Sequence, residues 1–372
     1  MILYITYNDQ PSGVYWSQVT DVVDHLNTLG GPRVRLLAFV SMRGFREARS
    51  RIHEHAPTAL VLPMVPKMRL WKWNQIALAC VCLLLRPKSI MARGVFATWM
   101  AQRMRSLRLI RKVCFDGRGA YAAEWEEYRL IDDDAIIAQV RPLEHAAIHR
   151  SDLRLAVSQA LVHHWKERYN WSGADHVVVP CTLGSDHAIV ERSGDRSDVQ
   201  HQVVLVYSGS TAGWQSFQLL KDLLEPLLLE QPHVNVLFLS KADANNQSLM
   251  QRFPGRVDVR WARPEEVGGI LAGCDLGLMV RENTITNQVA SPTKFAEYLA
   301  AGLPVLISAH IGDFSSMVRE HDLGVIVEAG ASLPRLTRTQ EARSARLQAF
   351  ARSHLTKQAF DGEYRRLLHA LS

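Results

Sequence analysis

Two charged side chains stand three positions apart in an otherwise apolar stretch, ASPTKFAEYLAAGLPVLIS, at residues 290–308. The stretch predicts a helix with Ser291 as its N-cap and Pro292 at the first helical position, followed by a buried strand. Lys294 lies at the positive end of the helix dipole, where a bound anion would offset its charge. Glu297 shares its face and could accept hydrogen bonds from two ribose hydroxyls. The pair predicts a clamp for a nucleoside diphosphate; the alternative is an ion pair on a solvated face.

A second group of charged residues ends two neighbouring predicted strands in the first half of the chain. Asp116 ends the strand KVCFD and is followed closely by Arg118. The carboxylate could orient an acceptor hydroxyl or act as a general base, or the two residues could form a structural pair that fixes the loop. Arg93 ends the strand SIMAR and is either a ligand for an acceptor phosphate or a solvated surface residue. Glu124 is a further candidate on the acceptor side.

Three patterns come close to metal or dinucleotide motifs without meeting their requirements. IDDDA at residues 131–135 contains Asp-x-Asp, but it precedes an apolar segment and predicts a helix N-terminus. His145 and His149 have the spacing of metal ligands, yet the H-E-x-x-H pattern and a third ligand are missing. SGSTAG at residues 208–213 is not G-x-G-x-x-G. We therefore expect a protein that works without a metal ion or an organic cofactor.

These residues must be positioned by strands, because short apolar strands alternate with helical segments along the whole chain. One series of strands begins at residues 2–7 and a second at residues 203–209. Such alternation predicts an α/β fold with parallel sheets covered by helices. We expect two facing Rossmann-like domains, residues 1–184 and 202–372, joined by a polar linker at 185–201. Ligands would bind in the interdomain cleft at the carboxyl ends of the strands, and the last helix could pack back on the first domain.

The net charge of +6 is unevenly distributed. Residues 1–175 contain 24 Lys and Arg against 16 Asp and Glu, and residues 66–112 contain eleven Lys and Arg with no acid. Trp71, Trp73 and Trp99 lie among these basic residues. The combination favours contact with an anionic membrane surface, with a solvated basic face over core helices as the alternative. Nucleic acid is disfavoured, because no nucleic-acid-binding motif accompanies the charge.

The five cysteines, Cys80, Cys82, Cys114, Cys181 and Cys274, all lie in apolar surroundings. They form no C-x-x-C pair, so we expect buried free thiols in a reducing compartment. MILYITY at the N-terminus predicts a strand and not a signal peptide. The longest apolar run, at residues 76–85, is too short to span a bilayer. A cytoplasmic protein at the inner face of the plasma membrane is therefore expected.

SPTKFAEYLAAGLPVL resembles the donor-binding motif of retaining GT-B glycosyltransferases of family four. LVYSGSTAGW (205–214) is similar to the loop after the first strand of their donor domain, and PEEVGGILAGCDLGLMV (264–280) to the segment before the motif. SIMARG (89–94) and FDGRGAYAAEWEE (115–127) look like the members that build bacterial surface polysaccharides.

The resemblance implies a donor that is a UDP- or GDP-linked sugar. It assigns the ribose to the glutamate and the diphosphate to the start of the helix. The donor-binding residues that it implies are Glu297, Lys294, Ser291, Thr293, Gly209 and Ser210. On the acceptor side it implies Gly13, Arg93, Arg118 and Glu124. The acceptor would be a glycan or a polyprenyl-linked glycan at the membrane.

The sequence departs from the family at the donor site. Val289 stands where many members have a first glutamate that holds the sugar, and STAGWQSF lacks the usual basic pair. Countercharge for the phosphates must then come from Lys294, Arg281 or the amides of residues 208–210. In this family the departing phosphate itself can accept the acceptor's proton. The expected catalytic residues are therefore Lys294 and Arg281, with Asp116 on the acceptor side.

Two other classes of protein remain possible. One is a nucleotide-binding oxidoreductase or epimerase on a similar fold, although the glycine fingerprint of nicotinamide enzymes is absent. The other is a catalytically weak accessory subunit, which the missing first glutamate suggests. Transfer or hydrolysis of a nucleotide sugar distinguishes the enzyme from the accessory subunit.

Overall fold

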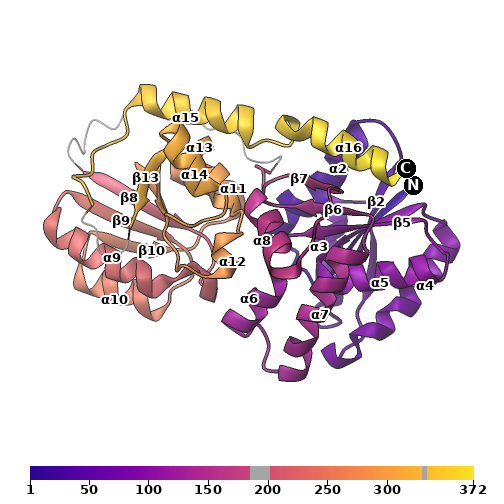
Figure 1. Cartoon of the computed structure of the whole chain (residues 1–372). Helices are drawn as coiled ribbons and strands as arrows, with labels where there is room; N and C mark the ends of the chain where they lie inside the picture. The colour runs from indigo at the N-terminus through magenta and orange to yellow at the C-terminus, as the bar shows by residue number, and fades with distance from the viewer. Residues whose placement is uncertain (185–201, 329–332) are drawn as a thin grey trace. The chain divides into compact units, whose positions relative to one another are not determined.

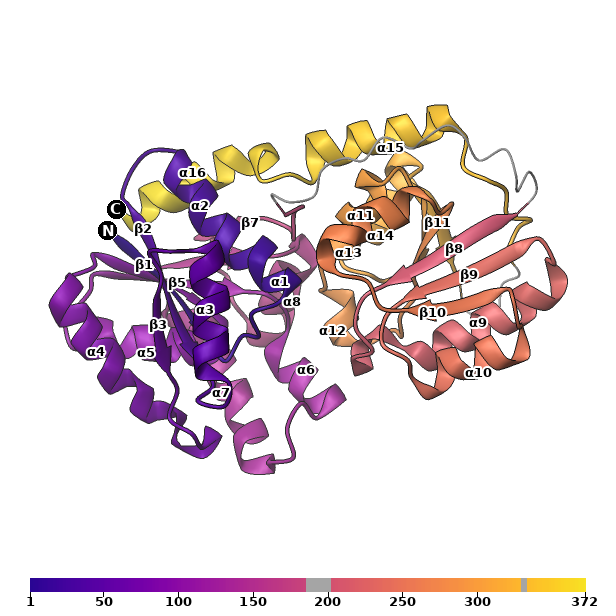
Figure 2. The same cartoon turned by 180° about the vertical axis from the view of Figure 1, so that it is seen from behind.

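The computed structural model describes residues 1–184, 202–328 and 333–372. The chain forms two compact units, one of residues 1–184 with 357–372 and the other between residues 185 and 356. The C-terminal helix thus belongs to the first unit (Figures 1 and 2). The predicted linker at 185–201 lies outside the described residues.

The first unit contains a seven-stranded sheet in the order β3-β2-β1-β4-β5-β6-β7. Every strand pairing described in it is parallel. The strands are β1 (Ile2–Tyr7), β2 (Val34–Val40), β3 (Leu60–Pro63), β4 (Ser89–Arg93), β5 (Lys112–Gly117), β6 (Leu153–Ala156) and β7 (His176–Val178). The order reverses between β1 and β4, and ligands of such sheets bind at this switch point.

Helices cover both faces of this sheet (Figure 1). The helical segments are α1 (Gly13–Tyr15), η1 (Trp16–Thr20), α2 (Asp21–Thr28), α3 (Phe45–His55), η2 (Met68–Trp73), α4 (Asn74–Leu85), α5 (Gly94–Ser106), α6 (Tyr121–Tyr128), α7 (Asp134–Arg150), α8 (Gln159–Tyr169), η5 (Gln358–Phe360) and α16 (Asp361–Leu371). Leu367 and Leu371 of α16 join the same core as Val23 of α2 and Met91 of β4. Lys112 donates a hydrogen bond to the Ala370 carbonyl oxygen at 2.6 Å, which anchors the end of the chain.

The second unit repeats this plan with six parallel strands in the order β10-β9-β8-β11-β12-β13. Its strands are β8 (Val203–Ser208), β9 (Val234–Leu239), β10 (Val257–Arg260), β11 (Leu276–Met279), β12 (Val305–Ser308) and β13 (Gly324–Val327). Its helical segments are η4 (Gly213–Gln215), α9 (Phe217–Glu230), α10 (Ala244–Arg252), α11 (Pro264–Ala272), α12 (Ile285–Gln288), α13 (Thr293–Ala300), α14 (Phe314–His321) and α15 (Glu341–His354). The predicted pair of Rossmann-like domains with parallel sheets is confirmed.

Local predictions have mixed outcomes. Asp133 caps α7 by accepting a hydrogen bond from the Ile136 amide, so IDDDA does begin a helix. The predicted start of the donor helix is wrong by one residue, because Pro292 keeps an extended ψ of 130° and is itself the N-cap of α13. Trp71 is fully buried, and Cys80 is exposed. The expectations that Trp71 contacts a membrane and that all cysteines are buried are therefore wrong.

Tyr298 fastens α13 to the carboxyl edge of the second sheet. Its hydroxyl accepts a hydrogen bond from the Ser208 amide at 2.9 Å and donates one to the Leu278 carbonyl at 3.2 Å. The ring is fully buried and packs directly over Gly277 of β11. A side chain at Gly277 would prevent this approach, so Gly277 sets the distance between α13 and the sheet.

We expect Gly277→Ala to lower the free energy of unfolding by about 1–3 kcal/mol, because the new methyl group overpacks the core. An ideal Cβ at Gly277 would lie 2.3 Å from Cδ2 of Tyr298. Gly269→Ala in the exposed face of α11 is the matched control. Its Cβ would meet no atom within 4 Å, and it should gain up to about 1 kcal/mol in helix propensity. Urea unfolding followed by circular dichroism measures both; equal stability of the two variants would contradict the packing argument.

Candidate functional site

The switch point of the second sheet lies between β8 and β11, and two segments with site candidates leave it. Gly209 and Ser210 follow β8, and Arg281 follows β11. The hydrogen bonds of Tyr298 place the first turn of α13 beside both segments. Lys294 in that turn and Arg281 therefore both reach the side chain of Gln215, which precedes them by 79 and 66 positions in the chain. The sequence-predicted donor residues are brought together here.

Lys294 is buried, with 6% of its surface exposed. Its ammonium group donates a hydrogen bond to Oε1 of Gln215 at 2.9 Å and lies 4.1 Å from the centroid of the Tyr207 ring. Burial, and then the charge of Arg281, hold the pKa of Lys294 well below its usual value, while Glu297 acts in the opposite direction. The attraction of Glu297 is thus too weak to offset burial and the second cation.

Arg281 approaches the same acceptor. Its Nη2 donates to Oε1 of Gln215 at 3.1 Å and its Nη1 to Oδ1 of Asn287 at 3.3 Å. Two buried cationic side chains thus converge on one neutral oxygen atom. Gln215 was not predicted from the sequence, although it stands in the loop that lacks the basic pair of family-four glycosyltransferases. A polar residue at that place in the loop was the signal in the sequence that could have identified Gln215 as a site residue.

The loop after β8 passes directly over the ammonium group. Gly209 has a φ of 145°, which favours glycine, and a Cβ there would lie 3.0 Å from Nζ of Lys294. Gly209 and Ser210 are both exposed. The Ser210 carbonyl accepts a hydrogen bond from the Tyr207 hydroxyl at 2.6 Å, which orients the loop. The cations therefore lie beneath an accessible backbone segment.

The remaining donor candidates lie on or beside α13. Ser291 is buried just before the helix, Thr293 is its first residue, and Glu297 is half-buried one turn further along. The arrangement combines two cations, a helix N-terminus and an exposed glycine loop. Such a set binds a phosphate or diphosphate anion, since each part is stabilised by negative charge. The Gln215 oxygen is the acceptor to which both cationic side chains donate.

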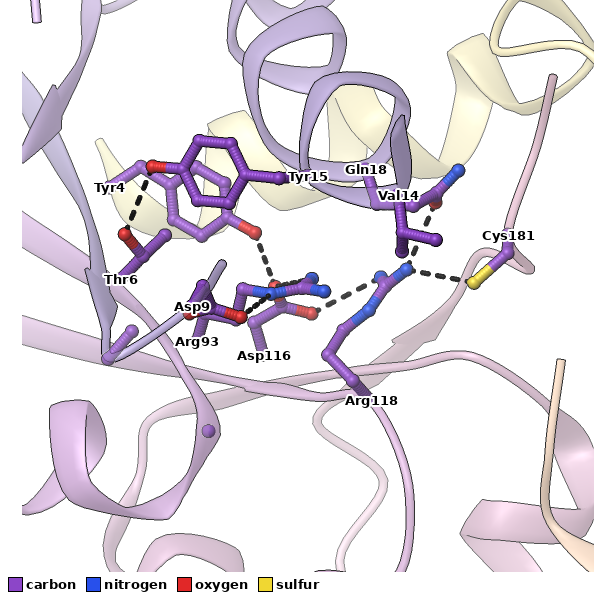
Figure 3. Close-up of polar contacts among 12 residues, drawn as sticks. Tyr4, Thr6, Asp9, Val14, Tyr15, Gln18, Arg93, Asp116, Arg118 and Cys181 are labelled. Carbon is purple, nitrogen blue, oxygen red and sulfur yellow. Dashed lines mark hydrogen bonds and ion pairs between the residues drawn. The ribbon is translucent and has the colours of Figure 1, made fainter. Parts of the chain in front are cut away.

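The first unit contains a different cluster at its own switch point, around Asp116 (Figure 3). Asp116 is fully buried and accepts a hydrogen bond from the Tyr4 hydroxyl at 2.5 Å. Burial and the Asp116 charge raise the pKa of Tyr4 well above its usual value, so the phenol keeps its proton. Arg93 and Arg118 approach the two carboxylate oxygens at 3.6 and 3.5 Å. The register pairs Arg93 directly with Asp116 across β4 and β5.

Further contacts hold both arginines in place. Nε of Arg93 donates to Asp9 at 3.2 Å, and Nη2 of Arg118 contacts Oε1 of Gln18 at 3.0 Å and Sγ of Cys181 at 3.1 Å. The Arg93 side chain is only 10% exposed, so the alternative of a solvated surface arginine is wrong. The two carboxylates balance the two guanidinium groups.

For Asp116 the geometry favours the structural alternative, because its oxygens face protein donors. We did not predict Tyr4, Asp9 and Gln18 as site residues, because their neighbours in the sequence give no sign of a shared partner. Gly13 begins the short helix α1 and is exposed. Glu124 lies on α6, where burial, followed by the charges of Glu144 and Glu127, raises its pKa to about 7.

Comparison with known proteins identifies the fold. No family model matches the chain, and no curated protein sequence matches it. Sucrose-phosphate synthase from Thermosynechococcus elongatus is similar in structure, with a TM-score of 0.72 and 12% identity, over 100% of this chain and 99% of that one. A glycosyltransferase from Rickettsia africae has a TM-score of 0.60 and 12% identity, over 100% and 92% of the two chains.

The same fold also occurs in an enzyme of another class. UDP-GlcNAc 2-epimerase from Neisseria meningitidis, in a structure with bound UDP-GlcNAc, has a TM-score of 0.52 and 10% identity, over 99% of this chain and 94% of that one. The chain therefore has the α/β fold with two Rossmann-like domains that is known as GT-B. Identities this low establish the fold alone.

We expect Lys294→Met to raise the free energy of unfolding of the ligand-free protein at pH 7, because it removes a buried charge. The pKa of Lys294 is lower in the folded than in the unfolded chain, so between those two values the unfolded chain binds more protons and stability rises with pH. Below the folded value the cost of burying the charge is complete. Methionine removes that cost and should flatten the rise of stability toward alkaline pH.

Urea denaturation at pH 7 to 10 measures both effects. Lys241→Met is the control, because Lys241 is exposed and such a change should alter stability by less than about 0.5 kcal/mol. A loss of several kcal/mol on Lys294→Met would show instead that Lys294 stabilises the fold and is not reserved for a ligand.

Proposed function

We propose that this protein is a glycosyltransferase that moves a sugar from a nucleotide diphosphate sugar to a glycan acceptor with retention of configuration. The observation that carries the proposal is the convergence of Lys294 and Arg281 on Gln215 beside the start of α13. A diphosphate can replace the neutral Gln215 oxygen as their partner. Glu297, one turn further along α13, then accepts hydrogen bonds from the ribose hydroxyls. UDP and GDP are the two proposed carriers.

The chemistry requires stabilisation of the departing phosphate. Lys294 and Arg281 supply positive charge at the oxygen that gains negative charge, and the amides after β8 add hydrogen bonds. The proposed donor contacts are Ser291, Thr293, Gly209 and Ser210, in addition to Lys294 and Glu297. The departing phosphate accepts the proton of the attacking hydroxyl on the same face of the sugar, so no protein nucleophile is needed.

The first unit is the proposed acceptor domain. Arg93, Arg118, Gly13 and Glu124 are its proposed acceptor contacts. Asp116 acts by holding the two arginines at fixed positions, as its hydrogen bond and ion pairs support. The proposed acceptor is a polyprenyl-linked glycan of bacterial surface polysaccharide synthesis, met at the cytoplasmic face of an anionic membrane. No helix in the described part of the chain is long and apolar enough to cross a membrane.

An epimerase acting on a nucleotide sugar is the second candidate, favoured by the structural similarity to the UDP-GlcNAc 2-epimerase. Both functions use the same diphosphate site and differ in the fate of the sugar. Incubation with UDP- and GDP-sugars, followed by proton NMR, distinguishes them. A transferase or slow hydrolase releases the nucleoside diphosphate, whereas an epimerase leaves the nucleotide sugar intact with one inverted carbon. A protein that binds the nucleotide but does neither is an accessory subunit.

We expect Glu297→Gln to weaken binding of the nucleotide sugar about tenfold to a hundredfold, because a charged hydrogen-bond acceptor contributes about 1.5–3 kcal/mol. Lys294→Ala should weaken UDP or GDP more than the bare nucleoside, since it acts through the diphosphate. Isothermal titration calorimetry measures both variants, after a thermal-shift screen selects the nucleotide. Glu320→Gln on the exposed end of α14 is the control. Unchanged affinity in Glu297→Gln would remove Glu297 from the donor site.

We expect activity to persist in EDTA, because Lys294 and Arg281 supply the charge that a divalent ion supplies in metal-dependent enzymes. Release of nucleoside diphosphate would be measured after chelation and again after addition of Mg²⁺ or Mn²⁺. Complete loss in EDTA with recovery on metal addition would refute the metal-independent mechanism while leaving the donor site untouched.

A further inference from the structure

The outer face of α4 in the first unit is apolar and exposed. Trp73, which precedes α4 as its N-cap, and Ile76, Leu83 and Leu84 of α4 have 60%, 53%, 60% and 81% of their surface exposed, and Cys80 between them is also exposed. Their spacing places all five on one side of a helix with 3.6 residues per turn. These five residues are called the α4 stripe below.

The opposite side of α4 is the side that packs in the protein. Asn74, Leu78 and Cys82, spaced four apart, are buried there. A surface helix of a globular protein normally carries charged residues on its outer side. NQIALACVCLLL has none, so α4 presents an apolar face to the fold and a second apolar face outward.

Basic residues surround the stripe. Lys67 and Lys72 precede α4, Arg86 and Lys88 follow it, and all four are exposed. Lys72 also lies 5.8 Å from the centroid of the half-buried Trp99 ring. No Asp or Glu occurs between residues 66 and 112. Arg69 differs from the other basic residues, because it pairs with Asp133 at 2.7 Å near the start of α7.

We propose that α4 lies in the plane of an anionic lipid bilayer, with the α4 stripe at the boundary of headgroups and acyl chains. The twelve residues of α4 span about 18 Å, which suits an in-plane helix and not a spanning one. Lys67, Lys72, Arg86 and Lys88 contact the phospholipid headgroups. The α4 stripe is thus the docking surface for the membrane contact that the proposed function includes. The purpose of this docking rests on that proposed function.

Charge decides between a bilayer and a second copy of the chain. Two copies that meet through the α4 stripe would bring two sets of basic residues together with no acid in residues 66–112 to compensate them. An anionic bilayer offers both an apolar layer and the complementary charge. The bilayer is therefore the occupant that satisfies both features of this surface.

Sedimentation with vesicles of phosphatidylglycerol and phosphatidylcholine tests the proposal without any nucleotide sugar. Binding should require the anionic lipid, decrease with salt, and leave a salt-resistant fraction from the stripe. Leu83→Glu/Leu84→Glu should remove that fraction. The matched control is Leu229→Glu/Trp261→Glu, which makes the same change at two exposed residues of the second unit and should bind like wild type. Lys67→Glu/Lys72→Glu/Arg86→Glu should weaken binding at least about tenfold.

Cys80 provides an independent measurement within the stripe. The other four cysteines are buried, so a thiol-reactive, environment-sensitive fluorophore attaches to Cys80. Its emission should shift to the blue on anionic vesicles and not on neutral ones.

Three results would overturn the proposal: no binding to anionic vesicles at low salt, binding that Leu83→Glu/Leu84→Glu leaves unchanged, or a lipid-free dimer that this variant dissociates. Calorimetric binding of UDP or GDP by the same variants reports on the donor site separately. A failure of docking is thereby distinguished from a failure of the proposed transferase function.

Discussion

The burial of Lys294 is the constraint on which the proposed donor site depends. An ammonium group within a sheet–helix junction loses solvation, and Lys294 donates its hydrogen bond to the neutral Gln215 oxygen at 2.9 Å. Arg281 donates a hydrogen bond to the same oxygen atom, so the Gln215 side chain holds the two cationic groups close enough to repel each other. A folded protein retains such a pair at a cost in stability. An anion that replaced the amide oxygen would recover that cost as binding free energy, as the proposed function requires.

The charged side chains are balanced at the switch point of the first sheet and unbalanced at that of the second. At the first, Asp9 and Asp116 balance Arg93 and Arg118, and the Tyr4 phenol completes the shell of Asp116. In this cluster the charges of the two arginines are already paired with carboxylates. At the second, cations converge on an amide, which suits a diphosphate. The same strand order thus supports two clusters with different charge requirements, which we propose as the acceptor site and the donor site.

Precision at the donor site comes from packing. The absence of a side chain at Gly277 admits the Tyr298 ring, whose hydroxyl bonds to β8 and β11 and holds the first turn of α13 at the sheet edge. A Cβ at Gly209 would lie 3.0 Å from Nζ of Lys294, so the glycine leaves room for the ammonium group beside the loop after β8. Both glycines thus position Lys294 by leaving room for neighbouring side chains, and neither needs to contact a ligand to do so.

The sequence by itself determined the two parallel sheets, the order of their elements and the pairing of Lys294 with Glu297 on one helix, because periodicity and local spacing carry that information. The convergence on Gln215 and the contacts of Tyr4, Asp9 and Gln18 were decided only by the tertiary structure, because the partners are distant in the chain. Arg281 and Gln215 are 66 positions apart, and Tyr4 and Asp116 are 112 positions apart. Likewise, the sequence showed that residues 66–112 are basic and apolar. Which side of α4 faces outward was decided by the packing of the fold, in which Leu78 and Cys82 are buried while Trp73 and Cys80 are exposed.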